Sequence, residues 1–225
     1  VDDWRKAHPL TYKQDDKITK PQYVIEKLYS LAKPDAIIAT DVGQHQMFAA
    51  QYFKGHKPRT WLTSGGLGTM GFGFPAAIGA QFAYPERQVF CITSEGSFQM
   101  NLQELVVAAE HKKSVKVVLL NNGVHGMVRQ WQDLFYEGRY SASVLGKMPD
   151  YVKLADAYGI AGMRALKPSE VEPVLREGIK HKGPVLMDIH TDPYENCYPM
   201  IPAGGAQHQM MLEDPPALKL AKKGG

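Results

Sequence analysis

Short apolar runs that do not alternate with polar residues constrain the fold of this chain most strongly. Such runs are typical of strands that are covered on both faces, as in parallel sheets. Six β-branched or apolar runs predict strands, and several of them lack alternation: residues 36–40, 60–63, 89–93, 115–120, 163–166 and 185–189. A segment of helical spacing, Pro21 to Lys33, precedes the first run, and further helical segments lie between the runs. The sequence therefore predicts an α/β fold, a parallel sheet of about six strands flanked by helices.

The chain divides into three parts by composition. Residues 1–20 are polar and lack a sustained period, so we expect a linker there, and residues 21–192 hold the predicted sheet. Residues 193–225 are rich in proline and glycine and predict a C-terminal lid and tail. With 225 residues, the chain is long enough to bury a core without disulfides or a structural metal.

Composition excludes several classes of protein. Cys91 and Cys197 are the only cysteines, which rules out a disulfide scaffold or a cysteine-rich zinc site. The net charge of +3 is scattered along the chain, so no nucleic-acid partner is expected. Apolar stretches such as 117–120 are too short to cross a bilayer, and no signal peptide opens the chain. We therefore expect a cytoplasmic protein that does not bind a membrane.

Ligands of open parallel sheets bind beyond the carboxyl ends of the strands, so the segments that follow the strands are candidate sites. These segments are residues 41–46, 64–73, 94–97 and 121–126. Gly66, Gly68 and Gly71 fit the G-x-G-x-x-G spacing of nicotinamide-dependent oxidoreductases. That fit is weak, because the glycines follow the second strand and the other segments stay unexplained.

Glu95 and Asn122 follow neighbouring strands and would converge above the sheet. Carboxylate and amide oxygens suit magnesium, which takes its remaining ligands from phosphate and water. The glycines nearby, Gly96 and Gly126 among them, would let backbone approach a diphosphate. The alternative is an ordinary turn followed by a capping box, since Asn101 and Glu104 have the N-cap and N3 spacing, and we accept the capping box for Glu104.

The motif residues resemble those of a known family. The run 95–105 followed by Asn121-Asn122 is similar to the thiamine-diphosphate motif, which begins Gly-Asp-Gly and ends Asn-Asn. Three segments, at 65–71, 126–131 and 198–202, look like the acetohydroxyacid synthase (acetolactate synthase) family in particular. The likeness extends from Trp4 to Met211 and covers that enzyme's C-terminal thiamine-diphosphate-binding domain.

The resemblance implies a role for individual residues. The cofactor-binding positions would be Gly43, Gln44, His45, Gly68, Met70, Gly96, Ser97, Gly126 and Met127. Met70 would lie against the aminopyrimidine, and Glu95, Asn122 and the carbonyl of Val124 would hold Mg²⁺. The catalytic positions would be Met127, beside the thiazolium, and Trp131, in the substrate channel. The alternative for His45 is a polar side chain at a helix start whose hydrogen bonds are satisfied within the protein. The alternative for Trp131 is an aromatic side chain of the hydrophobic core.

The reaction implied is thiamine-dependent carboligation of pyruvate with a second 2-oxo acid, in branched-chain amino-acid biosynthesis. The family's activating glutamate lies on an N-terminal domain of a partner subunit, and FAD binds a middle domain. Neither domain is in these residues, so we expect a homo-oligomer, with a regulatory small subunit as a further partner. The isolated chain should be inactive.

This sequence departs from the family pattern at Ser94-Glu95, where the motif has Gly-Asp. Glutamate is one methylene longer than aspartate, while Mg²⁺ tolerates little deviation from its preferred oxygen distances. Ser94 also lacks the backbone freedom of glycine, so serine at this position costs free energy unless φ there is negative. The alternative hypothesis is therefore a divergent, non-catalytic domain that binds cofactor weakly or only mediates assembly.

Overall fold

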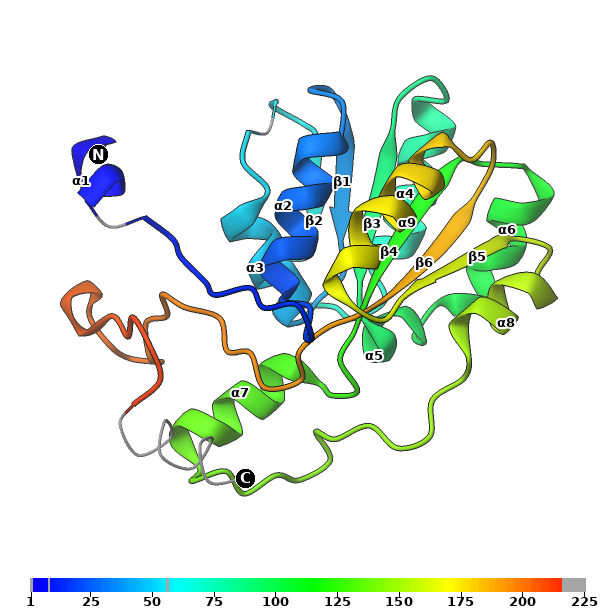
Figure 1. Cartoon of the computed structure of the whole chain (residues 1–225). Helices are drawn as coiled ribbons and strands as arrows, with labels where there is room; N and C mark the ends of the chain where they lie inside the picture. Colours follow the sequence, from blue (N-terminus) through cyan, green and yellow to red (C-terminus); the bar gives the residue numbers. More distant parts are fainter. Residues whose placement is uncertain (1, 8, 56, 216–225) are drawn as a thin grey trace.

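The computed structural model describes residues 2–7, 9–55 and 57–215 (Figure 1). Within them, six parallel strands form one sheet in the order β2-β1-β3-β4-β6-β5. The strands are β1 (Ile37–Thr40), β2 (Trp61–Thr63), β3 (Val89–Thr93), β4 (Val115–Asn121), β5 (Ala161–Ala165) and β6 (Val185–His190). The predicted parallel α/β sheet of six strands is confirmed.

Helices connect the strands and cover both faces of the sheet (Figure 1). The α-helices are α1 (Asp2–Ala7), α2 (Pro21–Leu31), α3 (Gln44–Tyr52), α4 (Gly73–Ala83), α5 (Glu95–Phe98), α6 (Leu105–Glu110), α7 (Gly126–Phe135), α8 (Tyr151–Ala157) and α9 (Pro168–Lys180). Two short 3₁₀ turns are η1 (Leu102–Glu104) and η2 (Gln207–Gln209). None of the helices in the described residues is long and apolar enough to span a membrane.

Two hydrophobic clusters, one on each face, explain why the strand sequences do not alternate. Phe90 and Ile92 of β3 pack with α2, α3 and α9. Val89 and Cys91 of the same strand point to the other face and pack with α4, α6 and α8. Because every residue of β3 is buried, both sets of side chains must be apolar.

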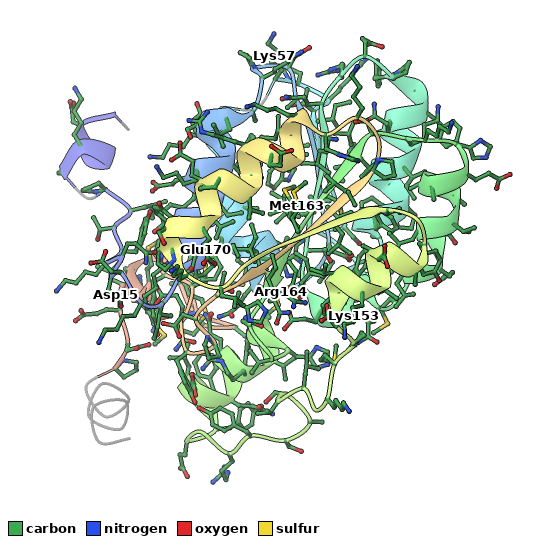
Figure 2. All side chains as sticks on the ribbon, turned by 45° about the vertical axis from the view of Figure 1, so that its right-hand side comes forward. Asp15, Lys57, Lys153, Met163, Arg164 and Glu170 are labelled. Atoms are coloured by element: carbon green, nitrogen blue, oxygen red, sulfur yellow. The ribbon has the colours of Figure 1, made fainter. Side chains whose placement is uncertain are left out.

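The edge strand β5 begins two residues earlier than the sequence predicts. The predicted run 163–166 ends at Leu166, which is exposed, whereas β5 ends at Ala165. An ion-pair cluster anchors this edge. Arg164, which is labelled in Figure 2, lies with its guanidinium 2.5 Å from Oδ1 of Asp150 and 2.9 Å from Oδ2 of Asp188 on β6. A charged side chain at Arg164, one residue before the end of β5, is therefore compatible with the place of β5 at the edge of the sheet.

The proposed division of the chain at residues 20 and 192 stays a prediction. Residues 1–20 include α1, with Val1 and His8 outside the described residues. The segment after β6 runs beside α7 (Figure 1) and is irregular apart from η2 and a bridge between Met200 and Met211. Residues 216–225 of the predicted lid and tail lie outside the described residues.

Candidate functional site

The predicted site residues converge beyond the carboxyl ends of β1, β3 and β4. A small cleft there is lined by Gln44, His45, Ser94, Asn122 and Gly126, among others. These residues come from segments far apart in the sequence, and the parallel order of the strands places them together. The carboxyl-end rule therefore located the cleft correctly.

Glu95 is a buried charged residue next to Ser94 of the cleft lining. Its side chain is completely buried, and burial raises the pKa of its carboxyl to about 7, although backbone hydrogen bonds oppose this. Oε1 accepts a hydrogen bond of 2.5 Å from the Gly123 backbone N–H. Oε2 is also buried and has no hydrogen-bond partner among the described residues. A buried carboxylate oxygen without a partner is costly, and a cation bound there would satisfy it.

Asn122 and Val124 lie on the same turn as Gly123. The Asn122 Oδ1 accepts a hydrogen bond of 3.2 Å from the Val124 N–H, and Val124 itself is buried. Together with Glu95 they offer a carboxylate, an amide oxygen and a backbone carbonyl, which is a hard-oxygen set that suits Mg²⁺. The residues present thus fit a divalent cation, and their role as its ligands stays a prediction.

Gly96 and Gly126 are glycines because neighbouring side chains occupy the space of a Cβ. A Cβ at Gly126 would lie 2.2 Å from Oε1 of Gln44, and one at Gly96 would lie 2.4 Å from Cε1 of His125. The Cε of Met70 approaches the same Gly96 position at 3.5 Å. The loop after β2 therefore meets the Glu95 turn at Met70, and contact of Met70 with a cofactor stays a prediction.

Gly43 and His45 begin α3 beneath the cleft. Gly43 has φ +151°, and a Cβ there would lie 2.7 Å from the His45 ring. Burial lowers the pKa of His45 to about 3, against a hydrogen bond to the Asp41 backbone, and its buried Nε2 lacks a partner among the described residues. The interpretation of His45 as a satisfied polar residue is therefore wrong, and a neutral imidazole faces this region.

Ser97 ties two loops together, whereas Gly68 bonds within its own turn. The Ser97 hydroxyl donates to the Val42 carbonyl at 2.6 Å, which joins the β3 and β1 loops. Gly68 has φ +64° and lies in the exposed turn after β2, where its N–H donates to Ser64. Contact of either residue with a cofactor stays a prediction.

The turn after α5 differs from the predicted capping box. Asn101 precedes η1, but its side chain makes no capping hydrogen bond. Its amide instead donates to the Gly71 carbonyl at 2.9 Å, across to the glycine-rich loop. The capping prediction for Asn101 and Glu104 is therefore wrong, because Asn101 serves a contact that sequence spacing does not reveal.

Helix α7 turns its polar side inward. Arg129, Gln130 and Asp133 are buried, whereas Trp131 is 36% and Phe135 40% exposed. The two exposed rings pack on each other at a centroid distance of 5.3 Å. The interpretation of Trp131 as a core aromatic is therefore wrong. An apolar outer face beside the cleft is what a substrate channel or a covering domain would need.

Met127 occupies the first turn of α7, directly after Gly126, and is partly buried. It thus lies at the end of the helix that meets the cleft. Trp131 follows one turn later on the same helix. Their predicted roles beside the thiazolium and in the channel agree with this order along α7 and stay predictions.

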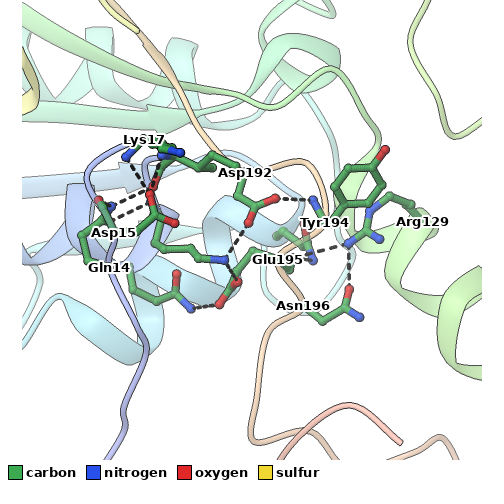
Figure 3. Close-up of polar contacts among 12 residues, drawn as sticks. Gln14, Asp15, Lys17, Arg129, Asp192, Tyr194, Glu195 and Asn196 are labelled. Carbon is green, nitrogen blue, oxygen red and sulfur yellow. Dashed lines mark hydrogen bonds and ion pairs between the residues drawn. The ribbon is translucent and has the colours of Figure 1, made fainter. Parts of the chain in front are cut away.

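A polar network that sequence reasoning missed holds α7 to the segment after β6 (Figure 3). The Arg129 guanidinium forms an ion pair with Asp133 and donates to Oδ1 of Asn196 at 2.7 Å. Lys20 Nζ lies 2.6 Å from both Asp192 and Glu195. Buried charges need such partners. The four-residue spacing of Arg129 and Asp133 on a helix was the one sequence signal that could have revealed this network.

The buried His45 predicts a pH-dependent stability. Between pH 6.5 and about 3 the unfolded chain binds a proton that the native imidazole does not, so the free energy of unfolding falls as pH falls. At pH 5 this contribution amounts to about 2 kcal/mol relative to neutral pH. Urea unfolding of wild type and His45→Gln at pH 7 and pH 5 measures it. Equal losses in both proteins would contradict the assignment.

Comparisons with known proteins agree with this site. The family described as "Thiamine pyrophosphate enzyme, C-terminal TPP binding domain" matches residues 41–189, which include the cleft residues Gln44, Asn122 and Gly126. This match replaces the nicotinamide interpretation of the glycines at 66, 68 and 71.

Individual relatives are acetolactate synthase large subunits. The chain is 45% identical to the large subunit of Haemophilus influenzae over 216 residues, which cover 96% of this chain and 38% of that protein. It is 47% identical to the isozyme 3 large subunit of Escherichia coli, over 94% of this chain and 38% of that protein. The chain is 46% identical to the large subunit of Cyanidium caldarium, over 92% of this chain and 35% of that protein.

The chain thus spans less than two fifths of the length of these relatives. The matched region contains the buried Glu95 turn, the Asn122 turn and the glycine-rich loop, in the geometry described above. On the family match and on these identities, the chain belongs to the thiamine pyrophosphate enzyme family, as its C-terminal TPP-binding domain.

Proposed function

We propose that this domain binds the diphosphate of thiamine diphosphate through Mg²⁺ and forms part of an acetolactate synthase active site. The observation that carries the proposal is the fully buried Glu95, whose Oε2 lacks a partner, beside the Asn122 and Val124 oxygens. A buried carboxylate at a strand end is costly to the fold, and a bound cation offsets that cost.

The residues around the cleft would divide the remaining tasks. Gly43, Gln44 and His45 at the start of α3, together with Gly68, Gly96, Ser97 and Gly126, would surround the diphosphate. Met70 would support the cofactor from the β2 loop, since its Cε lies close to Gly96. Met127 and Trp131 on α7 would line the route of the substrate.

When bound, thiamine diphosphate supplies the electron sink for decarboxylation of a 2-oxo acid and for carbon–carbon bond formation. The chain's own residues orient the cofactor and neutralise its charge. The substrates would be pyruvate and a second 2-oxo acid, in the branched-chain amino-acid pathway and in the cytoplasm.

The complete enzyme would be a homo-oligomer that carries FAD on another domain, with a regulatory small subunit as a further partner. The relatives are named as synthases, which favours this enzyme over the non-catalytic alternative. Acetolactate formation from pyruvate by the full-length protein, with and without thiamine diphosphate and Mg²⁺, tests the proposal. Activity that needs neither cofactor would contradict it.

Replacing Glu95 with aspartate is expected to tighten Mg²⁺ binding about tenfold, which corresponds to about 1.4 kcal/mol. Glutamate uses one oxygen on the Gly123 N–H at 2.5 Å. The shorter aspartate would not reach that N–H, so both oxygens would be available to the ion. Titration of Mg²⁺ at fixed thiamine diphosphate measures the change. The Asn122→Ala variant should weaken binding about tenfold, and unchanged affinity in both variants would exclude these residues as ligands.

The 225-residue chain alone is expected to form no acetolactate from pyruvate. Its relatives are more than twice as long, and the resemblance places the activating glutamate on another domain. A colorimetric acetolactate assay on the purified chain, beside the full-length protein, measures this. Turnover by the chain alone would show that the resemblance misplaces the catalytic machinery.

A further inference from the structure

Gln130 uses every hydrogen-bonding position of its amide while being completely buried. Its Nε2 donates to the Cys197 carbonyl at 3.2 Å and to Sδ of Met200 at 3.3 Å. Its Oε1 accepts from the Cys197 N–H at 2.8 Å and from Nε2 of Gln44 at 2.7 Å. Two donors and two acceptor sites exhaust a glutamine side chain. Gln130 therefore links the segment after β6 to the start of α3.

Backbone groups fix the orientation of both amides. The two ends of an amide resemble each other, so the surrounding network must decide which is oxygen. The Cys197 N–H can only donate, which places Oε1 of Gln130 against it. Gln44 must then present its NH₂ to that oxygen, and its second hydrogen goes to the Glu195 carbonyl at 2.9 Å. The Gln44 amide consequently has only its carbonyl oxygen left to offer.

That oxygen lies on the cofactor cleft. A Cβ built on Gly126 would come within 2.2 Å of Oε1 of Gln44, and within 3.2 Å of Nδ2 of Asn122. Gln44, Gly126 and Asn122 all line the cleft. A carbonyl oxygen accepts hydrogen bonds and repels phosphate oxygens. The group that meets the Gln44 oxygen must therefore carry a hydrogen, as a water on Mg²⁺ beside the diphosphate would.

We propose that Gln130 is a positioning residue that fixes the Gln44 amide with its carbonyl oxygen toward the cofactor cleft. The inference rests on the proposed function, because the ligand of that cleft is taken to be thiamine diphosphate with Mg²⁺. In the cleft, Gln44 would then act as a hydrogen-bond acceptor. The Glu195 carbonyl sets the orientation of the Gln44 amide directly, and the Cys197 backbone sets it through Gln130. Gln130 itself does not touch the cleft in this role.

The test compares three Gln130 variants in the full-length protein. Gln130→Met and Gln130→Ala remove the acceptor for Gln44 and should weaken thiamine diphosphate binding about tenfold, measured calorimetrically with Mg²⁺. Gln130→Glu should rescue affinity to within about threefold of wild type. A buried carboxyl stays protonated, so its O–H can donate to Cys197 while its carbonyl accepts from Gln44.

A matched control is Gln132→Met on the same helix. Gln132 donates to the Ser141 carbonyl at 3.0 Å and accepts from the Ser143 hydroxyl at 2.5 Å, so it holds a different segment. The Gln132→Met variant should bind thiamine diphosphate with the affinity of the wild type. Circular dichroism establishes which variants fold, and Gln130→Ala serves if Gln130→Met does not.

A second measurement separates positioning from a purely structural clamp. Cys197 is fully buried, so its alkylation rate, followed by peptide mass spectrometry, reports how often its segment opens. Faster alkylation in Gln130→Met or Gln130→Ala together with weaker cofactor binding and Gln130→Glu rescue supports the inference. Faster alkylation with unchanged cofactor affinity overturns it. Wild type that binds no thiamine diphosphate overturns the proposed function instead, whatever the alkylation rates show.

Discussion

Replacing Gly73 with alanine is expected to destabilise the fold by about 3 kcal/mol, the upper end for overpacking a well-packed site. Gly73 is the first residue of α4, and a Cβ there would lie 2.5 Å from the Asp41 nitrogen and 2.7 Å from the Thr40 carbonyl carbon. Both atoms are backbone at the end of β1, so no side chain can move aside. The helix would have to retreat from the strand.

Gly79 provides the control within the same helix. An added Cβ at Gly79 would meet nothing within 4 Å, so Gly79→Ala should stabilise the protein by roughly 0.5–1 kcal/mol through helix propensity. Urea denaturation of the three proteins measures both effects. A Gly73→Ala protein as stable as Gly79→Ala would show that α4 and β1 do not approach as closely as described.

Changing Glu95 to glutamine is expected to have two opposite effects. The free energy of cofactor binding should be reduced by about 2.7 kcal/mol, or a hundredfold in affinity, because the only carboxylate of the proposed metal site is lost. The cofactor-free protein should become more stable at pH 8. The pKa of the Glu95 carboxyl is about 7, so at pH 8 the charged carboxyl costs the native state about 3 kcal/mol. An unpartnered amide in the same place costs less.

Glu104→Gln is the matched control, since it makes the same substitution nine residues further along, on η1. Calorimetric titration and thermal unfolding should both leave this variant near wild type. If Glu95→Gln lost stability and kept its cofactor affinity, Glu95 would be a structural residue and the metal site would lie elsewhere.

Much of the fold was predictable because burial on both faces leaves a direct trace in sequence. The runs 89–93 and 115–120 are apolar apart from Thr93 and Lys116, and they became the central strands β3 and β4. The edge strand β5 was displaced by two residues, because an edge tolerates Arg164 and Gly162 and therefore carries a weaker pattern. Strand order was beyond the sequence argument, since apolar runs do not say which strands are neighbours.

The position of the site was predictable for a similar reason, because residues that follow parallel strands share one edge of the sheet. Its second layer was not. Gln130 and Arg129 looked like ordinary positions on an amphipathic helix, yet α7 buries them and exposes Trp131. The contacts of Gln130 with Gln44 and Cys197, and those of Arg129 with Asp133 and Asn196, explain this inversion.

The departure at Ser94 proves harmless to the backbone. Ser94 has φ −138° and ψ 174°, an extended conformation that any residue adopts. Serine in place of the family's glycine therefore causes no backbone strain at this position. What remains of the departure is the extra methylene of Glu95, whose carboxylate reaches the Gly123 N–H.

Calorimetric titration of the full-length protein with thiamine diphosphate, in Mg²⁺ and in a chelator, tests the metal-dependent diphosphate site most directly. The structure predicts saturable binding in Mg²⁺ that weakens at least a hundredfold when the metal is removed, because Glu95 would then face the diphosphate as an uncompensated buried carboxyl. Equal affinity with and without Mg²⁺, or no binding in either, would contradict the account.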